Sequence, residues 1–271
     1  MRTLWGDVLA TALGLAVRDL AVSLKRLPLA ADLASQDIHG KYKRTVLGPL
    51  WIALGQAATV GGFVLVFSSL FGLSVDVYAI YLAAGFPVWA LISSYLTDMP
   101  NAFVASKGFI ESYEVPWLTH IWRRSIGYLF VFAHQVITLF AAMAILRVPP
   151  KIEMLYALPA LLIVSVAGAG IGIALAVIGA RYRDLQPAMS IFAGVAFLFS
   201  PVMWRAEQLQ VNEWVVQYNP LYYVISLLRD PLLGVAPPAQ TWVISGGIAA
   251  GALITGVLVF LLSRRRLYHW L

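Results

Sequence analysis

The chain has 271 residues, of which 61% are hydrophobic and only 12% are charged, and this composition excludes an ordinary soluble domain. Its net charge of +6 does not by itself indicate nucleic-acid binding, because excess Lys and Arg in a membrane protein usually serve topology and lipid head groups. Cysteine is absent, which excludes disulfides, thiolate metal sites and a catalytic thiol.

The first 30 residues predict an amphipathic helix that lies on the membrane surface. Their apolar run, residues 8–17, is shorter than the ~20 residues that span a bilayer, and charged residues bracket it, which disfavours a cleaved signal peptide. Pro28 would end this helix, and a second amphipathic helix is predicted over residues 31–45. We therefore assign residues 1–49 to a cytoplasmic region of amphipathic helices.

The stretch Lys41–Trp51 changes from basic to apolar within a few residues. Lys41, Lys43 and Arg44 would stay among anionic head groups, because a charge at the bilayer centre costs at least ~2.5 kcal/mol. A Gly-Pro pair then breaks the chain before a new helix begins. These three cations are suited to attract an anionic substrate, and a generic cytoplasmic flank would contain the same residues.

Six later segments have the length and apolarity to span a bilayer. Fifteen of the 19 Lys and Arg residues lie in or directly beside the connections on one side of this layout, which predicts that both termini are cytoplasmic. The basic residues form no continuous stripe, so nucleic acid is not an expected partner. The spans are placed at residues 50–71, 78–98, 124–146, 157–179, 187–204 and 241–263, and residues 264–271 form a cytoplasmic tail. On the outer side lie Arg147, Lys151, Arg205 and Arg229.

The interiors of the predicted spans contain no Asp, Glu, Lys or Arg. This disfavours an ion-coupled carrier and a membrane-embedded hydrolase, since both need ionisable groups there. The isolated His134 is better explained by a hydrogen bond to a neighbouring helix than by a proton site. Glycines suited to close helix packing gather in the fourth span, at Gly168, Gly170, Gly172 and Gly179.

A phosphate-binding P-loop is absent from the sequence. The pair Gly40-Lys41 has Ser35 where the first glycine of that motif belongs and Tyr42 where a hydroxyl should ligate Mg²⁺. We therefore expect a chain that is not an enzyme and holds no cofactor or metal itself. If the chain is an active transporter, ATP and Mg²⁺ would bind to a separate motor protein.

Residues 101–123 form the longest predicted cytoplasmic connection between spans, and a motor protein would need such a feature to dock. The connection combines bulky apolar residues with carboxylates ahead of Pro116, a composition that suits a short docking helix. An interfacial loop with aromatic anchors is the alternative. The predicted docking residues are Phe109, Ile110, Glu111, Tyr113 and Glu114.

An external stretch, residues 205–240, is rich in aromatic residues, and its apolar run Leu221–Leu233 is too short to span a bilayer. It predicts a re-entrant or interfacial helical segment before the sixth span. Tyr218, Tyr222 and Tyr223 would contact a glycan as it leaves, because aromatic faces stack on sugar rings, or they would form an ordinary interfacial belt.

Three motifs, in this order along the chain, carry a family resemblance. They are Arg44-Thr-Val-Leu-Gly-Pro-Leu-Trp, Ser200-Pro-Val-Met-Trp and Asn219-Pro-Leu-Tyr-Tyr-Val-Ile-Ser-Leu-Leu-Arg. Over about residues 30–265 the chain resembles the permease subunits of bacterial ABC exporters for cell-surface polysaccharides, namely O-antigen, capsule and teichoic acid. The fold class expected is thus an all-α integral membrane protein with six transmembrane helices.

The resemblance implies a homodimer in the bacterial inner membrane, joined to two separate ABC ATPase subunits. It also implies export of a polyprenyl-diphosphate-linked glycan, O-antigen in particular, along a hydrated path lined by the first and fifth spans of both copies. In this chain those spans and their ends supply Phe63, Phe67, Phe71, Phe192, Phe197, Phe199 and Trp204.

Two other function classes remain open at this point. The same framework would suit an ABC permease for a smaller amphiphile, such as a drug or a lipid. A passive channel or membrane scaffold is the second, and it would not bind an ATPase.

Overall fold

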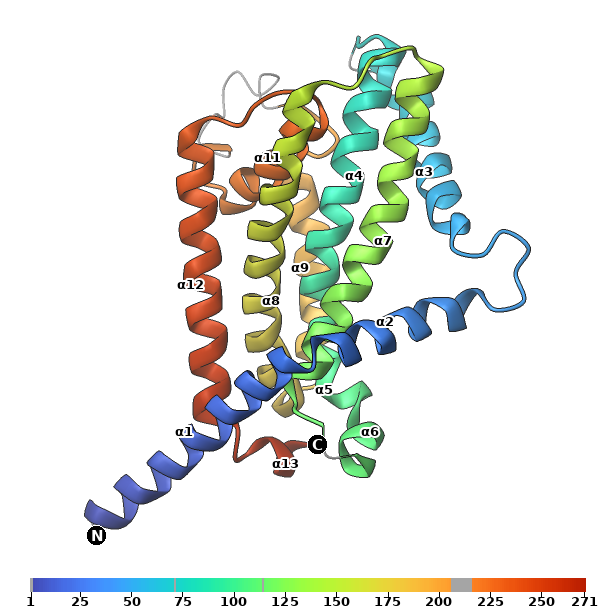
Figure 1. Cartoon of the computed structure of the whole chain (residues 1–271). Coiled ribbons are helices and arrows are strands. Elements are labelled where there is room, and N and C mark those ends of the chain that lie inside the picture. Colours follow the sequence, from blue (N-terminus) through green and yellow to red (C-terminus); the bar gives the residue numbers. More distant parts are fainter. Residues whose placement is uncertain (1, 71, 114, 206–215) are drawn as a thin grey trace.

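The computed structural model describes residues 2–70, 72–113, 115–205 and 216–271, with side chains from residue 14 onward. Within these residues every regular element is a helix, which confirms the predicted all-α class (Figure 1). Both chain termini lie at one end of the helical bundle, here named the terminal end (Figure 1). The other end is named the opposite end.

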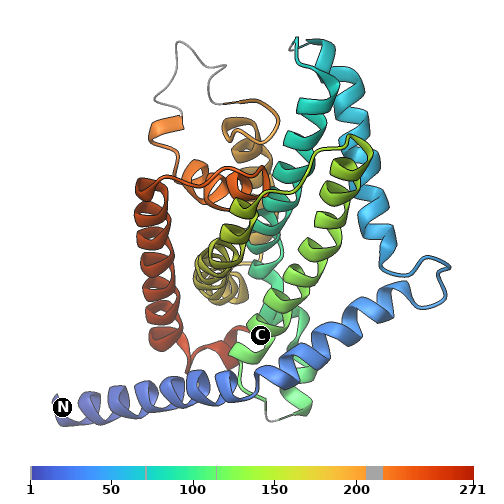
Figure 2. The same cartoon turned by 45° about the horizontal axis from the view of Figure 1, so that its top comes forward.

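Two consecutive helices, α1 (Arg2–Lys25) and α2 (Leu27–Tyr42), cross the terminal end, and α1 extends beyond the bundle (Figures 1 and 2). The predicted break near Pro28 is present, but Pro28 lies inside the first turn of α2. This position suits proline, because the first-turn N–H groups have no intrahelical acceptor. Helix α2 therefore begins and ends earlier than predicted, and it packs against α7.

Five helical segments are long and apolar enough to cross a membrane, and each overlaps a predicted span. From the first to the fourth, successive segments run in opposite directions along the bundle, whereas the fifth runs in the same direction as the fourth (Figure 1). The five are α3 (Leu50–Leu70), Val75–Ser112 beginning with α4 (Val75–Thr97), α7 (Leu118–Ile145), Ile152–Arg181 ending in α8 (Ala157–Arg181), and α12 (Ala239–Ser263).

The predicted fifth span, residues 187–204, is a shorter apolar helix, α9 (Leu185–Phe199). It stops at Phe199 because Ser200 precedes a proline and takes an extended conformation, with φ −106° and ψ 139°. Its 15 residues rise ~22 Å at 1.5 Å per residue, less than the ~30 Å of a hydrocarbon core. The count of six full-length spans is thus not confirmed.

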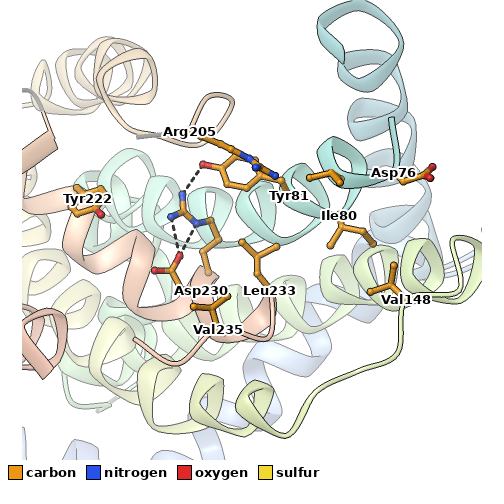
Figure 3. A pocket seen from close by; sticks show the side chains of 11 residues that line it. Asp76, Ile80, Tyr81, Val148, Arg205, Tyr222, Asp230, Leu233 and Val235 are labelled. Carbon is orange, nitrogen blue, oxygen red and sulfur yellow. Dashed lines mark hydrogen bonds and ion pairs between the residues drawn. The ribbon is translucent and has the colours of Figure 1, made fainter. Parts of the chain in front are cut away.

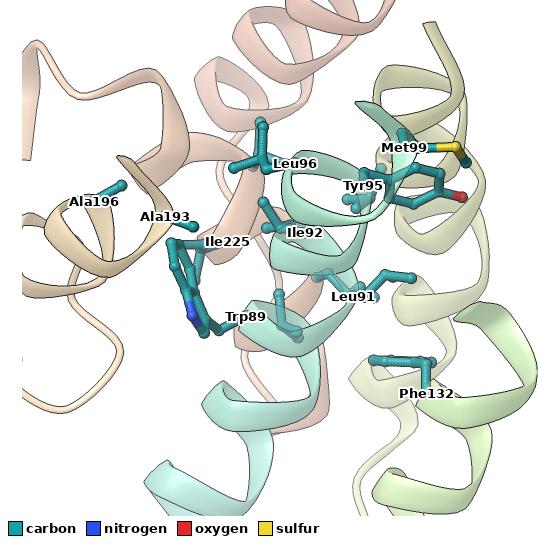
Figure 4. Packing of buried hydrophobic residues seen from close by; sticks show 14 of the residues in the cluster. Trp89, Leu91, Ile92, Tyr95, Leu96, Met99, Phe132, Ala193, Ala196 and Ile225 are labelled. Atoms are coloured by element: carbon teal, nitrogen blue, oxygen red, sulfur yellow. The ribbon is translucent and has the colours of Figure 1, made fainter. Parts of the chain in front are cut away.

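Helix α4 forms the centre of the bundle and contacts α3, α7, α8, α9 and α11 (Pro220–Leu232). Its buried side chains face several of these neighbours at once, with Trp89 toward α9 and Tyr95 toward α8 (Figure 4). Tyr78, Leu82 and Leu91 are at most 2% exposed. The residues that surround α4 therefore form the apolar core.

Close packing of α8 depends on the glycines that the sequence analysis identified. A Cβ on Gly170 would lie 2.5 Å from the backbone of Ala252 on α12, and a Cβ on Gly179 would clash with the carbonyl of Pro100. A Cβ on Gly168 would enter the ring of Tyr95. The prediction of close helix contacts in this span is confirmed.

Short elements complete both ends of the bundle. At the terminal end, η1 (Met99–Asn101), α5 (Ala102–Ala105) and α6 (Lys107–Ser112) follow α4, and α13 (Leu267–Trp270) follows α12 (Figure 1). At the opposite end lie η2 (Ile152–Tyr156) and α11. The predicted helical segment before the last span is thus present as α11.

Candidate functional site

The predicted docking residues lie on and just after α6, a short helix at the terminal end. Ile110 is 6% exposed and anchors α6 to the bundle, whereas Tyr113 is 60% exposed. Phe109 is half-buried, with its ring 4.8 Å from that of Tyr113. Glu111 is exposed and pairs with Lys107 at 3.7 Å, and Glu114 lies outside the described residues. The exposed part of this feature is therefore smaller than the sequence indicated.

Behind α6, Trp117 joins three distant parts of the chain. Its ring is 1% exposed and packs edge-on against Phe103 and Tyr268, at centroid distances of 5.3 and 4.9 Å. Its backbone N–H donates to Asp19 Oδ2 at 3.1 Å, and the guanidinium of Arg264 lies 5.1 Å from the ring centroid. The loop after α6 is thus fixed to α1 and to the C-terminal tail, a connection that sequence reasoning missed.

The three cations predicted to meet the substrate do not share one cavity. Lys41 lines a cavity of about 870 Å³ between α2, α6 and α7, whereas Lys43 lines a neighbouring cavity of about 550 Å³. Arg44 is exposed in the connection to α3 and has a left-handed φ of 75°. The larger cavity also contains Arg123 and Arg124, which the sequence analysis did not identify as site residues.

The aromatic residues predicted to line a path fall into two groups. Phe63 stacks on Phe67 at 5.4 Å and, like Phe197, contacts Phe86 of α4, so these rings pack inward. Phe192 and Phe199 of α9 are about half exposed, at 50% and 55%. Trp204 follows α9 and donates its Nε1–H to the carbonyl of Leu198 at 3.1 Å, and Phe71 lies outside the described residues.

A cavity of about 550 Å³ opens at the opposite end of the bundle, between α4, α11 and the loop after α9 (Figure 3). Arg229, which is 7% exposed, lines it and donates from Nη1 to the Tyr81 hydroxyl at 2.9 Å and to the Pro201 carbonyl at 2.6 Å. Its Nε and Nη2 donate to Asp230 Oδ1 at 3.1 and 2.9 Å. Arg205 also lies 5.3 Å from the Tyr81 ring centroid.

This buried cluster determines the course of the loop that follows α9. The hydroxyl of Tyr78 donates to the Met203 carbonyl at 2.9 Å, and the Tyr81 hydroxyl lies 2.8 Å from the Trp204 carbonyl. A sequence signal was available, since Arg205 and Arg229 are two of the four cations on the side that the sequence analysis predicts to be external, where the positive-inside rule disfavours them. Membrane topology alone does not account for these two residues.

The three external tyrosines have different environments. Tyr222 lines the cavity at the opposite end, and its ring packs edge-on against Tyr223 at 5.2 Å. The Tyr223 hydroxyl donates to the Gln217 carbonyl at 3.1 Å, whereas Tyr218 is 82% exposed. Asn219 caps α11 by accepting from the Leu221 N–H at 2.9 Å. Tyr222 is therefore the only one of the three that lines this cavity.

Among the described residues, no group of three or more His, Asp or Glu side chains gathers closely enough to hold a metal ion. The polar contacts instead hold helix ends and loops together at both ends of the bundle. Such an arrangement suits passage and docking.

Comparison with known proteins adds an independent finding. The family model described as "ABC-2 type transporter" matches residues 41–233, which include α6, the α7 side of the larger terminal-end cavity and the Arg229 cluster. Two curated relatives from Klebsiella pneumoniae, both named O-antigen export system permease protein RfbA, are 21% identical over 208 residues. The similarity covers 74% of this chain and 79% of each relative.

Proposed function

The chain belongs to the ABC-2 type transporter family, and on that premise we propose that it is the permease subunit of an ATP-driven polysaccharide exporter. Its substrate is a polyprenyl-diphosphate-linked glycan of the O-antigen type, which it moves outward across the bacterial inner membrane. The observation that carries this proposal is the pair of relatives named O-antigen export permeases, matched over most of their length.

The motor is a separate pair of ABC ATPase subunits that hold ATP and Mg²⁺. They dock at the terminal end, on the exposed part of α6 and on Tyr113, which places both termini in the cytoplasm. The shape of this region supports docking, because the loop after α6 is fixed through Trp117 to α1 and the C-terminal tail. A displacement of α6 would therefore be transmitted to α1 and to the C-terminal tail.

A second copy of the chain completes the path. A glycan cannot cross hydrocarbon, so the spans must enclose a hydrated route while the lipid tail stays in the bilayer. Helices α3 and α9 expose large apolar side chains such as Leu65, Ile191 and Leu198, at 82%, 71% and 65%. These exposed faces support pairing of α3 and α9 with a second copy around the route.

The decisive experiment measures ATP hydrolysis by the reconstituted permease–ATPase complex. We expect lipid-linked glycan to stimulate hydrolysis, and the carrier lipid without sugar or a small drug-like amphiphile to stimulate it less. Equal stimulation by the small amphiphile would instead support the smaller-substrate alternative. A permease that never purifies with an ATPase would support the channel or scaffold alternative. Deletion of the gene should also remove surface polysaccharide, and the cloned gene should restore it.

A further inference from the structure

The larger cavity at the terminal end changes character along its depth. Near the chain termini its wall carries charged and polar residues from α2 and α7, among them Lys41, His120, Arg123 and Arg124. Further along α7 the wall is formed by Gly127, the ring of Tyr128 and Val131. A molecule with an anionic head and an apolar chain would match both parts.

His120 is the residue that indicates an occupant. It is 1% exposed, and neither of its ring nitrogens has a hydrogen-bond partner. Nearly all buried polar side chains are hydrogen-bonded, because a buried polar group without a partner loses its hydrogen bonds to water and gains none in return. An acceptor group in the cavity would satisfy the imidazole N–H.

Three cations, Lys41, Arg123 and Arg124, and two carboxylates, Asp37 and Asp98, line the cavity, and this excess of positive charge favours an anionic acceptor. Asp37 is already engaged, since it accepts from Arg123 Nε at 2.6 Å. Arg124 donates to the backbone carbonyl of Asp98 at 3.3 Å, and neither Arg124 nor Lys41 forms an ion pair among the residues that the structure describes. Two cations and an unpaired histidine thus line one space, where phosphate oxygens would form charge-assisted hydrogen bonds.

We propose that this cavity binds the phosphate or diphosphate head of a lipid, held by Lys41 and Arg124 with His120 as a hydrogen-bond donor. The lipid chain leaves along α7, past Gly127 and Val131. The head group is either the diphosphate of the polyprenyl carrier or the phosphate of an anionic phospholipid. The inference rests on the proposed function only where the carrier lipid is the source.

A ligand in the cavity would affect the position of α6, on which the ATPase is proposed to dock. The rings of His120 and Phe109 pack edge-on at 5.4 Å, so a ligand that fixes His120 also fixes one side of α6. An ATPase docked on α6 would then sense whether a lipid head group is in place. The site therefore links substrate loading to the motor.

The test is lipid binding by the purified permease–ATPase complex, counted by native mass spectrometry as lipid is added. The probes are polyprenyl diphosphate, phosphatidylglycerol and polyprenol, the last of which lacks phosphate. The double variant Lys41→Gln, Arg124→Gln should bind the phosphate-bearing lipids about tenfold or more weakly, since each cation near an anionic group contributes ~1 kcal/mol. His120→Phe keeps the ring contact with Phe109 and should weaken binding severalfold.

The matched control is the double variant Lys25→Gln, Arg266→Gln. Both residues are exposed at the same end of the bundle and lie outside the cavity, so this variant loses the same charge and should bind as the wild type does. Membrane insertion and co-purification of the ATPase are checked for every variant.

The outcomes separate the two lipid sources and the failure of the site. Tighter binding of polyprenyl diphosphate than of phosphatidylglycerol assigns the carrier lipid. Equal binding of both lipids, with the same loss on the Lys41 and Arg124 changes, assigns a general anionic-lipid site. That assignment would stand even if the exported substrate is not a glycan. Wild-type binding by the double variant, or binding of polyprenol equal to that of both phosphate-bearing lipids, overturns the inference. It is also overturned if the ATPase itself crosslinks into the cavity and excludes lipid.

Discussion

Asp19 and Arg264 form an ion pair although 245 positions separate them, with Arg264 Nε 3.1 Å from Asp19 Oδ2. The Asp19 side chain is 4% exposed, and its carboxylate also accepts the backbone N–H groups of Trp117 and Leu118. One carboxylate therefore holds α1, the start of α7 and the C-terminal tail together.

Replacing Asp19 should loosen all three of these attachments. Asp19→Ala leaves Arg264 and two N–H groups without an acceptor, and removing one partner of a buried ion pair costs about 3–5 kcal/mol. Asp19→Asn keeps one acceptor oxygen and should cost less. Hydrogen exchange of residues 14–25, together with the thermal unfolding midpoint, measures the effect. Asp32→Ala, at an exposed position on α2, is the control and should change little.

The same carboxylate predicts a pH dependence. Burial raises the pKa of Asp19 above its ordinary value of 3.8, and this outweighs the opposing effects of Arg264 and the backbone N–H groups of Trp117 and Leu118. The folded protein thus binds this proton more tightly than the unfolded chain does, so the contribution favours folding below pH 3.8 and is lost as pH rises through the native pKa. Unfolding midpoints should therefore fall for the wild type relative to Asp19→Asn as pH rises through this window. A constant difference between the two proteins would contradict the assignment.

Docking of the ATPase should depend on the exposed side chain of Tyr113, whereas the buried side chain of Ile110 should affect only the stability of the permease. The double variant Glu111→Arg, Tyr113→Asp changes only exposed side chains, so the permease should insert normally but lose most of its ATPase in co-purification. Tyr113→Phe keeps the ring and should retain the partner. Ile110→Ala should instead lower the stability of the permease by about 2–5 kcal/mol, because Ile110 is buried. Full ATPase retention by the double variant would remove α6 from the docking surface.

Alanine substitution of the external tyrosines should affect export differently, according to whether the tyrosine lies at the cavity or away from it. Tyr222→Ala, Tyr223→Ala should assemble with the ATPase but export poorly, because stacking of a ring on nucleobases, a related contact, is worth ~1–3 kcal/mol. The corresponding Phe variants should keep most activity. Tyr218→Ala, at an 82% exposed position outside the cavity, is the matched control and should export normally. Surface polysaccharide per assembled complex is the measurement, and normal export by the Ala double variant would make these rings interfacial belt residues.

The Arg229 cluster should be needed to hold the loop after α9. Arg229→Ala removes the ion pair with Asp230 and one of the two hydrogen bonds to the Pro201 carbonyl, which the Tyr81 hydroxyl also donates to, so we expect a loss of about 3–5 kcal/mol. Tyr81→Phe removes only the hydroxyl and should cost about 1–3 kcal/mol. Thermal unfolding in detergent reports both values. Arg147→Ala, at an exposed position on the same end, should cost at most about 0.5 kcal/mol.

The sequence by itself determined the helical class and the positions of most long helices. Apolar length is a local property, so five of the six predicted spans overlap long apolar helices without reference to any neighbour. The glycines of α8 were also identified from the sequence, since small residues in a span have few other uses. Motif order was enough to indicate the family that the comparison identifies.

Only the tertiary structure decided which polar residues contact one another or line the same cavity. Asp19 reaches Arg264, Arg229 reaches Tyr81, and Lys41 shares a cavity with Arg124, each across long stretches of sequence. No periodicity predicts such pairs, because they depend on how the helix ends lie relative to one another once the apolar faces have packed. The same packing buried Ile110, one of the residues that composition had predicted for docking. The length of an apolar segment can thus be read from consecutive residues. A buried ion pair or an unpaired histidine, in contrast, arises only where distant segments of the chain come together.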